Sequence, residues 1–175
     1  MRRITIAESK QLIKYFDKGI DSEAFEWFLN IAEQGCIDVF YYIGWFYKHG
    51  YGVHRNSEKA FEWFLRAAEQ DNGVTQGDAQ YEVGYCYMQG KIVKRNPQKA
   101  FEWFMKAAQT EERRSQFHVG EYFEFGYGAV EPDINKAREW YYKAAINDHE
   151  EAKDAYERLK EPLSLIKKRA VYDDE

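Results

Sequence analysis

The stretch Ala60-Phe-Glu-Trp63-Phe recurs in this chain as Ala24-Phe-Glu-Trp27-Phe, Ala100-Phe-Glu-Trp103-Phe and Ala137-Arg-Glu-Trp140-Tyr. The four tryptophans are spaced by 36, 40 and 37 residues. Self-similarity at such a period is typical of solenoids, in which each unit buries its apolar faces against its neighbours. The repeat therefore predicts an array of stacked units.

A second pattern accompanies this stretch: Tyr41-Tyr-Ile-Gly44-Trp-Phe-Tyr47 with Gly50, Tyr81-Glu-Val-Gly84-Tyr-Cys-Tyr87 with Gly90, and Phe117-His-Val-Gly120-Glu-Tyr-Phe123 with Gly126. Together the two patterns resemble the Sel-one-like repeat (SLR) family, relatives of the tetratricopeptide repeat, over about residues 5 to 160. The resemblance implies an all-α fold, an α/α right-handed superhelical solenoid of SLR helix pairs.

The repeats define the expected domain organisation. We predict one solenoid over residues 1–160, with units at about 5–35, 36–71, 76–110 and 113–147, a capping helix at 149–160 and a C-terminal tail at 161–175. The first unit is shortened and begins with a helix from about Ile6 to Lys18. An insertion, Asp71 to Gly77, lengthens one turn; it is either a tolerated surface loop or part of a binding edge.

Helical periodicity indicates what each second helix buries. Ala60, Trp63, Phe64 and Ala67 fall at i, i+3, i+4 and i+7, so they share one face. Gly44 is predicted to lie inside a helix, where glycine costs about 1 kcal/mol relative to alanine. We therefore expect a close helix approach at this glycine, with a ring of the Trp63 type as its neighbour.

Short polar residues and glycines mark the expected helix ends. Side chains that can cap a helix N-terminus occur four residues before the repeated alanine, at Asn56, Asn96 and Asp133. Glycines with positive φ are expected at the preceding C-termini, at Gly50, Gly90 and Gly126.

Composition narrows the possible locations and partners. The start of the chain lacks the apolar run of a signal peptide, and no stretch reaches the roughly 18 apolar residues of a spanning helix. Only Cys36 and Cys86 are present, so reduced thiols and a cytoplasmic location are expected, with no membrane partner. The net charge of −5 weighs against a nucleic-acid partner.

Catalytic and metal-binding patterns are not found. His49, His54, His118 and His149 show no paired metal spacing, so we expect no metal and no cofactor. Gly50-Tyr-Gly52 lacks the lysine and hydroxyl of a phosphate-binding loop, and Ser164-Leu-Ile-Lys167 lacks the companion motifs of penicillin-recognising enzymes. We therefore predict no catalytic residues.

In tetratricopeptide relatives the first helix of each pair lines the concave side, and the resemblance implies the same here. The helix register then places these residues in a concave groove: Tyr41, Trp45, Lys48, His49, Tyr81, Tyr85, Met88, Gln89, Phe117, Glu121, Glu124 and Phe125. The rings at Tyr41, Trp45, Tyr81 and Tyr85 are candidate hot spots, because aromatics with a polar end are favoured anchors of protein interfaces. The alternative is that strong curvature buries these rings between units.

Three classes of function remain open. The resemblance implies a non-enzymatic protein–protein interaction module, an adaptor or scaffold that binds a protein or peptide through the groove. A second class is a dedicated inhibitor or immunity protein that occludes a toxin, which the short length and acidic charge would suit. A third is a weak hydrolase of the cysteine-rich SLR type, although this chain lacks a cysteine pair in each repeat.

Overall fold

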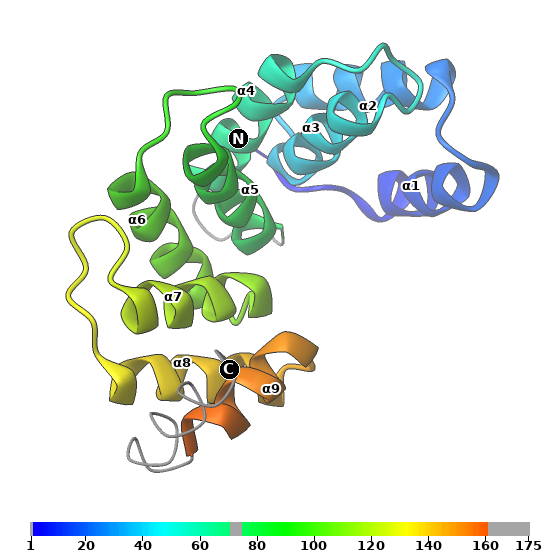
Figure 1. The fold of residues 1–175 in the computed structure, drawn as a ribbon. Helices are drawn as coiled ribbons and strands as arrows, with labels where there is room; N and C mark the ends of the chain where they lie inside the picture. The colour runs from blue at the N-terminus through cyan, green and yellow to red at the C-terminus, as the bar shows by residue number, and fades with distance from the viewer. Residues whose placement is uncertain (1, 71–74, 161–175) are drawn as a thin grey trace, which may run out of the picture. The chain divides into compact units, whose positions relative to one another are not determined.

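The structure is a computed structural model that describes residues 2–70 and 75–160. Within these ranges the chain forms nine α-helices and one short 3-10 helix, and its only β-type pairing is an isolated bridge between Arg2 and Cys36 (Figure 1). The predicted all-α class is confirmed. The insertion at 71–77 lies partly outside the described residues, and the predicted tail at 161–175 lies wholly outside them.

The chain divides into two compact units, residues 1–96 and residues 97–175. The first contains α1 (Ile6–Lys18), α2 (Ser22–Glu33), the 3-10 helix η1 (Ile37–Val39), α3 (Phe40–His49), α4 (Ser57–Ala68) and α5 (Gln76–Gln89). The second contains α6 (Pro97–Ala108), α7 (Arg113–Phe125), α8 (Ile134–Ile146) and α9 (Glu150–Lys160). In each unit, helices that follow one another in sequence pack together, α3 on α4 and α4 on α5, then α6 on α7, α7 on α8 and α8 on α9.

The predicted helix ends have the expected physical causes. The Asn56 side chain accepts a hydrogen bond of 2.8 Å from the Lys59 amide at the start of α4, and Asp133 caps α8 in the same way. Helices α3, α5 and α7 each end at a glycine in the left-handed region, with φ of 78° at Gly50, 70° at Gly90 and 69° at Gly126. At each of these glycines the left-handed backbone ends the helix and lets the chain turn away from it.

The core column of the second helices is the ring that follows each tryptophan. Phe28, Phe64, Phe104 and Tyr141 are at most 2% exposed, whereas Trp27, Trp63, Trp103 and Trp140 are only half-buried. On the face predicted to hold both Trp63 and Phe64, the tryptophan is therefore the less buried of the two. Each of the last three indoles lies under a cation one turn later in its helix; the Arg66 guanidinium, for example, lies 4.6 Å from the Trp63 ring centroid.

The mid-helix glycines are notches for these buried rings. A Cβ at Gly44 would lie 2.8 Å from two ring atoms of Phe64, and one at Gly120 would lie 2.6 Å from Tyr141. Real Cβ contacts are longer than this, so only glycine fits without a shift. The predicted close approach is confirmed, but the neighbour of Gly44 is Phe64 and not Trp63. The first helices bury Ile43, Val83 and Val119 completely.

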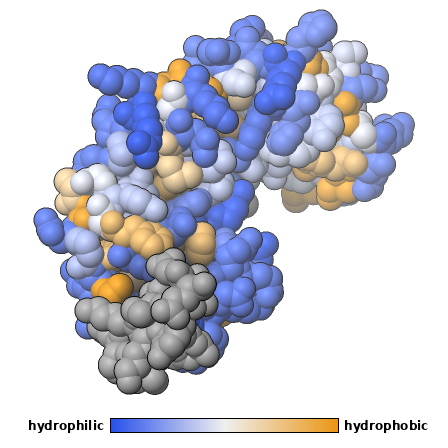
Figure 2. Space-filling view, viewed as in Figure 1, coloured by the Kyte–Doolittle hydropathy of each residue, from blue (hydrophilic) through white to orange (hydrophobic). Residues whose placement is uncertain are grey.

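Helix α1 begins and ends where the sequence predicted but buries none of its residues. Its aromatic rings contact the rest of the first unit. The ring centroids of Tyr15 and Trp27 lie 5.5 Å apart, and so do those of Phe16 and Tyr42. Ile6 and Ile13 are exposed, and Figure 2 shows an apolar area over this helix. None of the helices in the described ranges is both long enough and apolar enough to cross a membrane.

Candidate functional site

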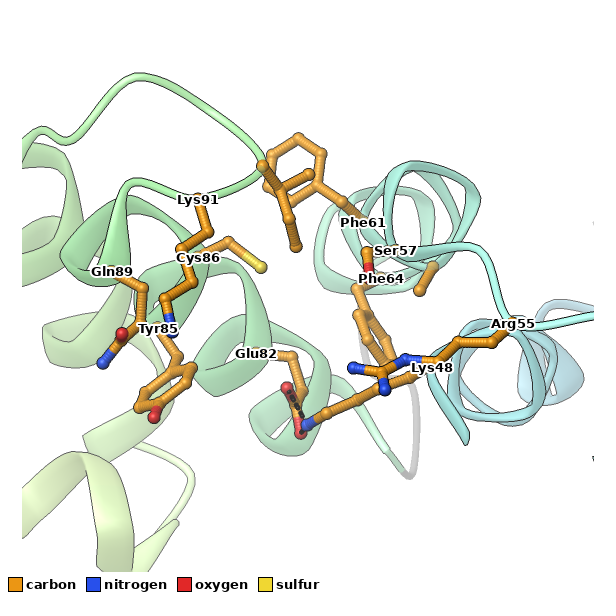
Figure 3. A pocket seen from close by; sticks show the side chains of 12 residues that line it. Lys48, Arg55, Ser57, Phe61, Phe64, Glu82, Tyr85, Cys86, Gln89 and Lys91 are labelled. Atoms are coloured by element: carbon orange, nitrogen blue, oxygen red, sulfur yellow. Dashed lines mark hydrogen bonds and ion pairs between the residues drawn. The ribbon is translucent and has the colours of Figure 1, made fainter. Parts of the chain in front are cut away.

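A pocket of about 200 Å³ opens in the first unit between α4 and α5, beside the end of α3 (Figure 3). The loops after α3 and α5 complete its wall. It is lined by Lys48, Arg55, Ser57, Ala60, Phe61, Phe64, Glu82, Tyr85, Cys86, Gln89, Lys91 and Ile92. The stacking of one repeat on the next therefore leaves a hollow next to the predicted groove residues.

The inner wall of this pocket is apolar. The rings of Phe61 and Phe64, the Ile92 side chain and the Cys86 thiol all border it. Burial, followed by the charge of Glu82, raises the pKa of the Cys86 thiol to about 11. Cys86 therefore stays protonated at neutral pH and acts as a small apolar group, since the thiolate is the reactive form.

An ion pair crosses the pocket between two first helices. The Lys48 ammonium of α3 donates to both carboxylate oxygens of Glu82 on α5, at 2.8 Å and 2.7 Å (Figure 3). The Glu82 side chain is only 6% exposed, whereas that of Lys48 is 39% exposed. Because both oxygens already accept from one ammonium, Glu82 is neutralised and holds the two helices in register.

Two further cations stand at the pocket without an acidic partner. Arg55, from the loop before α4, and Lys91, from the loop after α5, both line the cavity and are exposed. Across residues 2–70 and 75–160, neither side chain takes part in any hydrogen bond or ion pair. The mouth of the pocket therefore carries positive charge that Glu82 does not offset.

The predicted groove residues of the first unit fall into three places. Lys48, Tyr85 and Gln89 line the pocket. Trp45 and His49 form a ring stack with Tyr51, with centroids 4.8 Å from Trp45 to each of the other two. Partial burial, and then the charge of Lys48, lowers the pKa of His49, so this ring is neutral at pH 7.

Tyr41, Tyr81 and Met88 are the remaining predicted groove residues of this unit, and all three are half-buried. The Tyr41 ring packs against that of Phe64 in its own repeat, with centroids 5.6 Å apart, whereas the Tyr81 ring stacks on that of Tyr85 with centroids 5.9 Å apart. Tyr85 itself is 36% exposed. Binding by these residues stays a prediction.

The predicted groove residues of the second unit line a separate cavity of about 310 Å³ between α7 and α9. Its wall consists of Phe117, Glu121, Glu124, Phe125, Tyr141, Glu151, Asp154, Ala155 and Arg158. Glu124 accepts from the Tyr141 hydroxyl at 2.8 Å and pairs with Arg158 at 2.6 Å. Burial and this hydrogen bond raise the pKa of Tyr141, so its hydroxyl remains a donor at every physiological pH.

The other members of this second set are partly engaged. Glu121 contacts His118 Nδ1 at 2.7 Å, and Phe117 stacks on His149 with centroids 4.6 Å apart. Phe125 is 52% exposed and contacts Tyr127 at 5.6 Å. Phe125 is therefore the ring of this set that is most available to a partner.

Sequence reasoning missed four residues near the first pocket. Glu82 was missed because its partner Lys48 is 34 positions away, and Arg55, Lys91 and Tyr51 because only helical positions entered the register. A signal for the tyrosine was present, since Gly50-Tyr51-Gly52 recurs as Gly126-Tyr-Gly128 in the corresponding loop of a later repeat. A loop residue that recurs at the same place in two repeats, as this tyrosine does, can be predicted from the sequence to be part of the repeat.

No group of three or more histidine, cysteine, aspartate or glutamate residues that could hold a metal ion occurs within the described residues. Cys36 and Cys86 are both free and buried. The two cavities present aromatic rings, apolar walls and charged groups.

Comparison with known proteins identifies the same repeats as the paired helices, the glycines that contact buried rings and the columns of buried rings. The family model for the Sel1 repeat matches residues 21–36, 41–72, 77–109 and 113–149. The chain belongs to the Sel1 repeat family. Its helices therefore form an all-α solenoid of Sel1 repeats. Sel1 repeat and Sel-one-like repeat (SLR) are two names for the same unit, so the predicted family is confirmed.

Solved structures share this fold. A Sel1 repeat protein from Oxalobacter formigenes is 28% identical with a TM-score of 0.68, and the match covers 77% of this chain and 53% of that one. A protective antigen present in uropathogenic Escherichia coli strains, which displays an SLR fold, is 24% identical with a TM-score of 0.74. That match covers 87% of this chain and 33% of the other. The chain thus spans about half and a third of these two proteins. Curated proteins give no significant match.

Proposed function

We propose that this Sel1 repeat protein is a non-enzymatic adaptor or scaffold that holds a segment of a partner protein against its first helices. Sel1 repeat proteins generally mediate protein–protein interaction. The part of this proposal that is specific to the chain is the surface of the first unit, namely the groove residues on α3 and α5. A cytoplasmic location and the absence of a nucleic-acid partner belong to the same proposal, supported by the free thiols and the acidic net charge.

One observation carries the proposal: aromatic rings on and just after the first helices of the first unit keep solvent-exposed surface after the helices have packed. Tyr85 is 36% exposed beside the pocket, and Trp45, His49 and Tyr51 form a stack in which Tyr51 is 44% exposed. Stacked rings lose little side-chain entropy on binding, because neighbouring rings already hold them in place. Such preorganised aromatics are the usual anchors of a protein interface.

The proposal is tested with a pair of alanine variants. Trp45→Ala/Tyr85→Ala removes one half-buried and one exposed ring from the first helices, and Tyr142→Ala, 49% exposed on α8, is the matched control. Proteins captured from the native cell by the wild-type chain are identified, purified and measured by calorimetry against all three chains. We expect the double variant to lose at least about 2 kcal/mol of binding free energy, as hot-spot rings do.

One result would contradict the proposed surface, and another would distinguish an inhibitor from an adaptor. Equal affinity of the wild type and the double variant would show that partners use another surface. A partner whose own activity stops when it binds would identify the chain as an inhibitor, whereas a partner that stays active and recruits a third protein would identify an adaptor.

A further inference from the structure

We infer that the pocket in Figure 3 selects partner segments that carry an acidic side chain next to an apolar one. This inference rests on the proposed function and specifies the chemistry of its partner. It concerns one occupant, an aspartate or glutamate of a protein segment together with its apolar neighbour. The size of the pocket, its inner wall and the charges at its mouth all favour this occupant.

The size and wall of the pocket suit one apolar side chain. Its volume of about 200 Å³ is below the roughly 300 to 1,000 Å³ of sites that enclose a whole small molecule. Phe61 and Phe64 offer ring faces, and the protonated Cys86 thiol adds no charge. An aliphatic or aromatic side chain placed here would lose its water shell against carbon and sulfur.

The mouth of the pocket suits a carboxylate. Lys48 and Glu82 neutralise each other, which leaves the charges of Arg55 and Lys91 uncompensated within the part of the chain that the structure describes. This local excess of positive charge occurs in a chain with a net charge of −5. Local charge of the opposite sign to the whole chain favours an acidic partner group at this position.

A basic segment is disfavoured by the same geometry. Among the residues that the structure describes, Glu82 is the only carboxylate that lines the pocket, and both of its oxygens already accept from Lys48. An incoming lysine would face Arg55 and Lys91 with no acceptor to offset the repulsion. The planar guanidinium of Arg55 matches the two oxygens of a carboxylate, which adds geometric preference to the charge.

The test uses an array of short random peptides, N-acetylated and C-amidated so that no terminal charge is present. The full chain is compared with Arg55→Glu/Lys91→Glu, which reverses the charge at the pocket. Lys10→Glu/Lys14→Glu on α1 is the control, because it changes the net charge equally and neither lysine lines the pocket. Circular dichroism of each chain checks that helical content is unchanged.

We expect the wild type and the control to select peptides in which an acidic residue adjoins an apolar one, and the reversed variant to select lysine or arginine instead. For an individual selected peptide, affinity should fall at least about tenfold in the reversed variant. Replacing its aspartate or glutamate by the corresponding amide should weaken binding to the wild type in the same direction.

Three outcomes overturn the inference. These are no enrichment of acidic residues, the same enrichment in the reversed variant, and binding that appears only when a free C-terminal carboxylate replaces the amide. If the selected peptides lack acidic residues but lose affinity in Trp45→Ala/Tyr85→Ala, the inference fails while the proposed function stands. If no chain selects any peptide, both fail.

Discussion

The close contact between Gly44 and Phe64 leads to a prediction about Gly44→Ala. Whether this substitution raises or lowers the free energy of unfolding should depend on whether the Phe64 ring is present. In an open helix, Gly→Ala stabilises by about 1 kcal/mol. In this chain the new methyl would lie 2.8 Å from Cδ1 and Cε1 of Phe64, a ring that is 2% exposed and cannot move aside freely. Overpacking of this kind costs about 1–3 kcal/mol. Gly44→Ala should therefore be neutral to destabilising by up to about 2 kcal/mol in the wild type.

The same substitution should become stabilising once the ring is removed. Phe64→Ala alone should cost about 3–5 kcal/mol, the usual range for a buried phenylalanine. In that background the methyl that Gly44→Ala introduces meets no ring. The higher helix propensity of alanine should then raise the free energy of unfolding by up to about 1 kcal/mol. The carbonyl oxygen of Ala60, 3.1 Å from the added Cβ, remains and will reduce this gain slightly.

The assay is urea denaturation of the four chains, followed by circular dichroism, with stability compared as a double-mutant cycle. The coupling between the two positions should be about 1–3 kcal/mol. If Gly44→Ala stabilises the wild type and the Phe64→Ala variant equally, the notch is not filled by this ring and the packing argument is wrong.

Two further predictions concern the pocket. Lys48→Met should destabilise the fold by about 1–3 kcal/mol because it leaves the buried Glu82 carboxylate unpaired. Glu82→Gln should cost less, since the Lys48 ammonium can reach water. A lower urea midpoint for Glu82→Gln than for Lys48→Met would contradict this. The pKa of Cys86 is raised from 9.0 to about 11, so the stability linked to its thiol should be complete below pH 9 and should be lost as the pH rises through 11. Cys86→Ala should remove this alkaline component of the pH–stability curve, and an unchanged curve would show that another group titrates.

Much of the fold could be predicted from the sequence because the signals were local. The bounds of α1, the cap at Asn56 and the positive φ of Gly50 each depend on residues within one turn. The identity of the ring in the notch could not be predicted in this way. Trp63 and Phe64 lie on the same predicted face, and only the packing of α3 on α4 determines which of them meets Gly44.

The candidate site was less predictable because it joins positions that are far apart in the chain. Lys48, Tyr85 and Gln89 were identified by helical register, and all three line the pocket. Arg55 and Lys91 come from loops, and helical periodicity contains no information about where loop side chains point. Locating them required the packing of one repeat against the next.

The ring that fills the last notch differs from its counterparts in one atom. Phe28, Phe64 and Phe104 occupy the earlier repeats, but Tyr141 adds a hydroxyl that donates to Glu124, which in turn pairs with Arg158 of α9. The terminal helix is thus attached through polar groups as well as through its small apolar face of Ala152, Ala155 and Leu159. The repeats are consequently not interchangeable parts. An engineer who copies an internal phenylalanine-containing unit into this position would lose the polar attachment of α9, so the tyrosine should be kept wherever α9 follows.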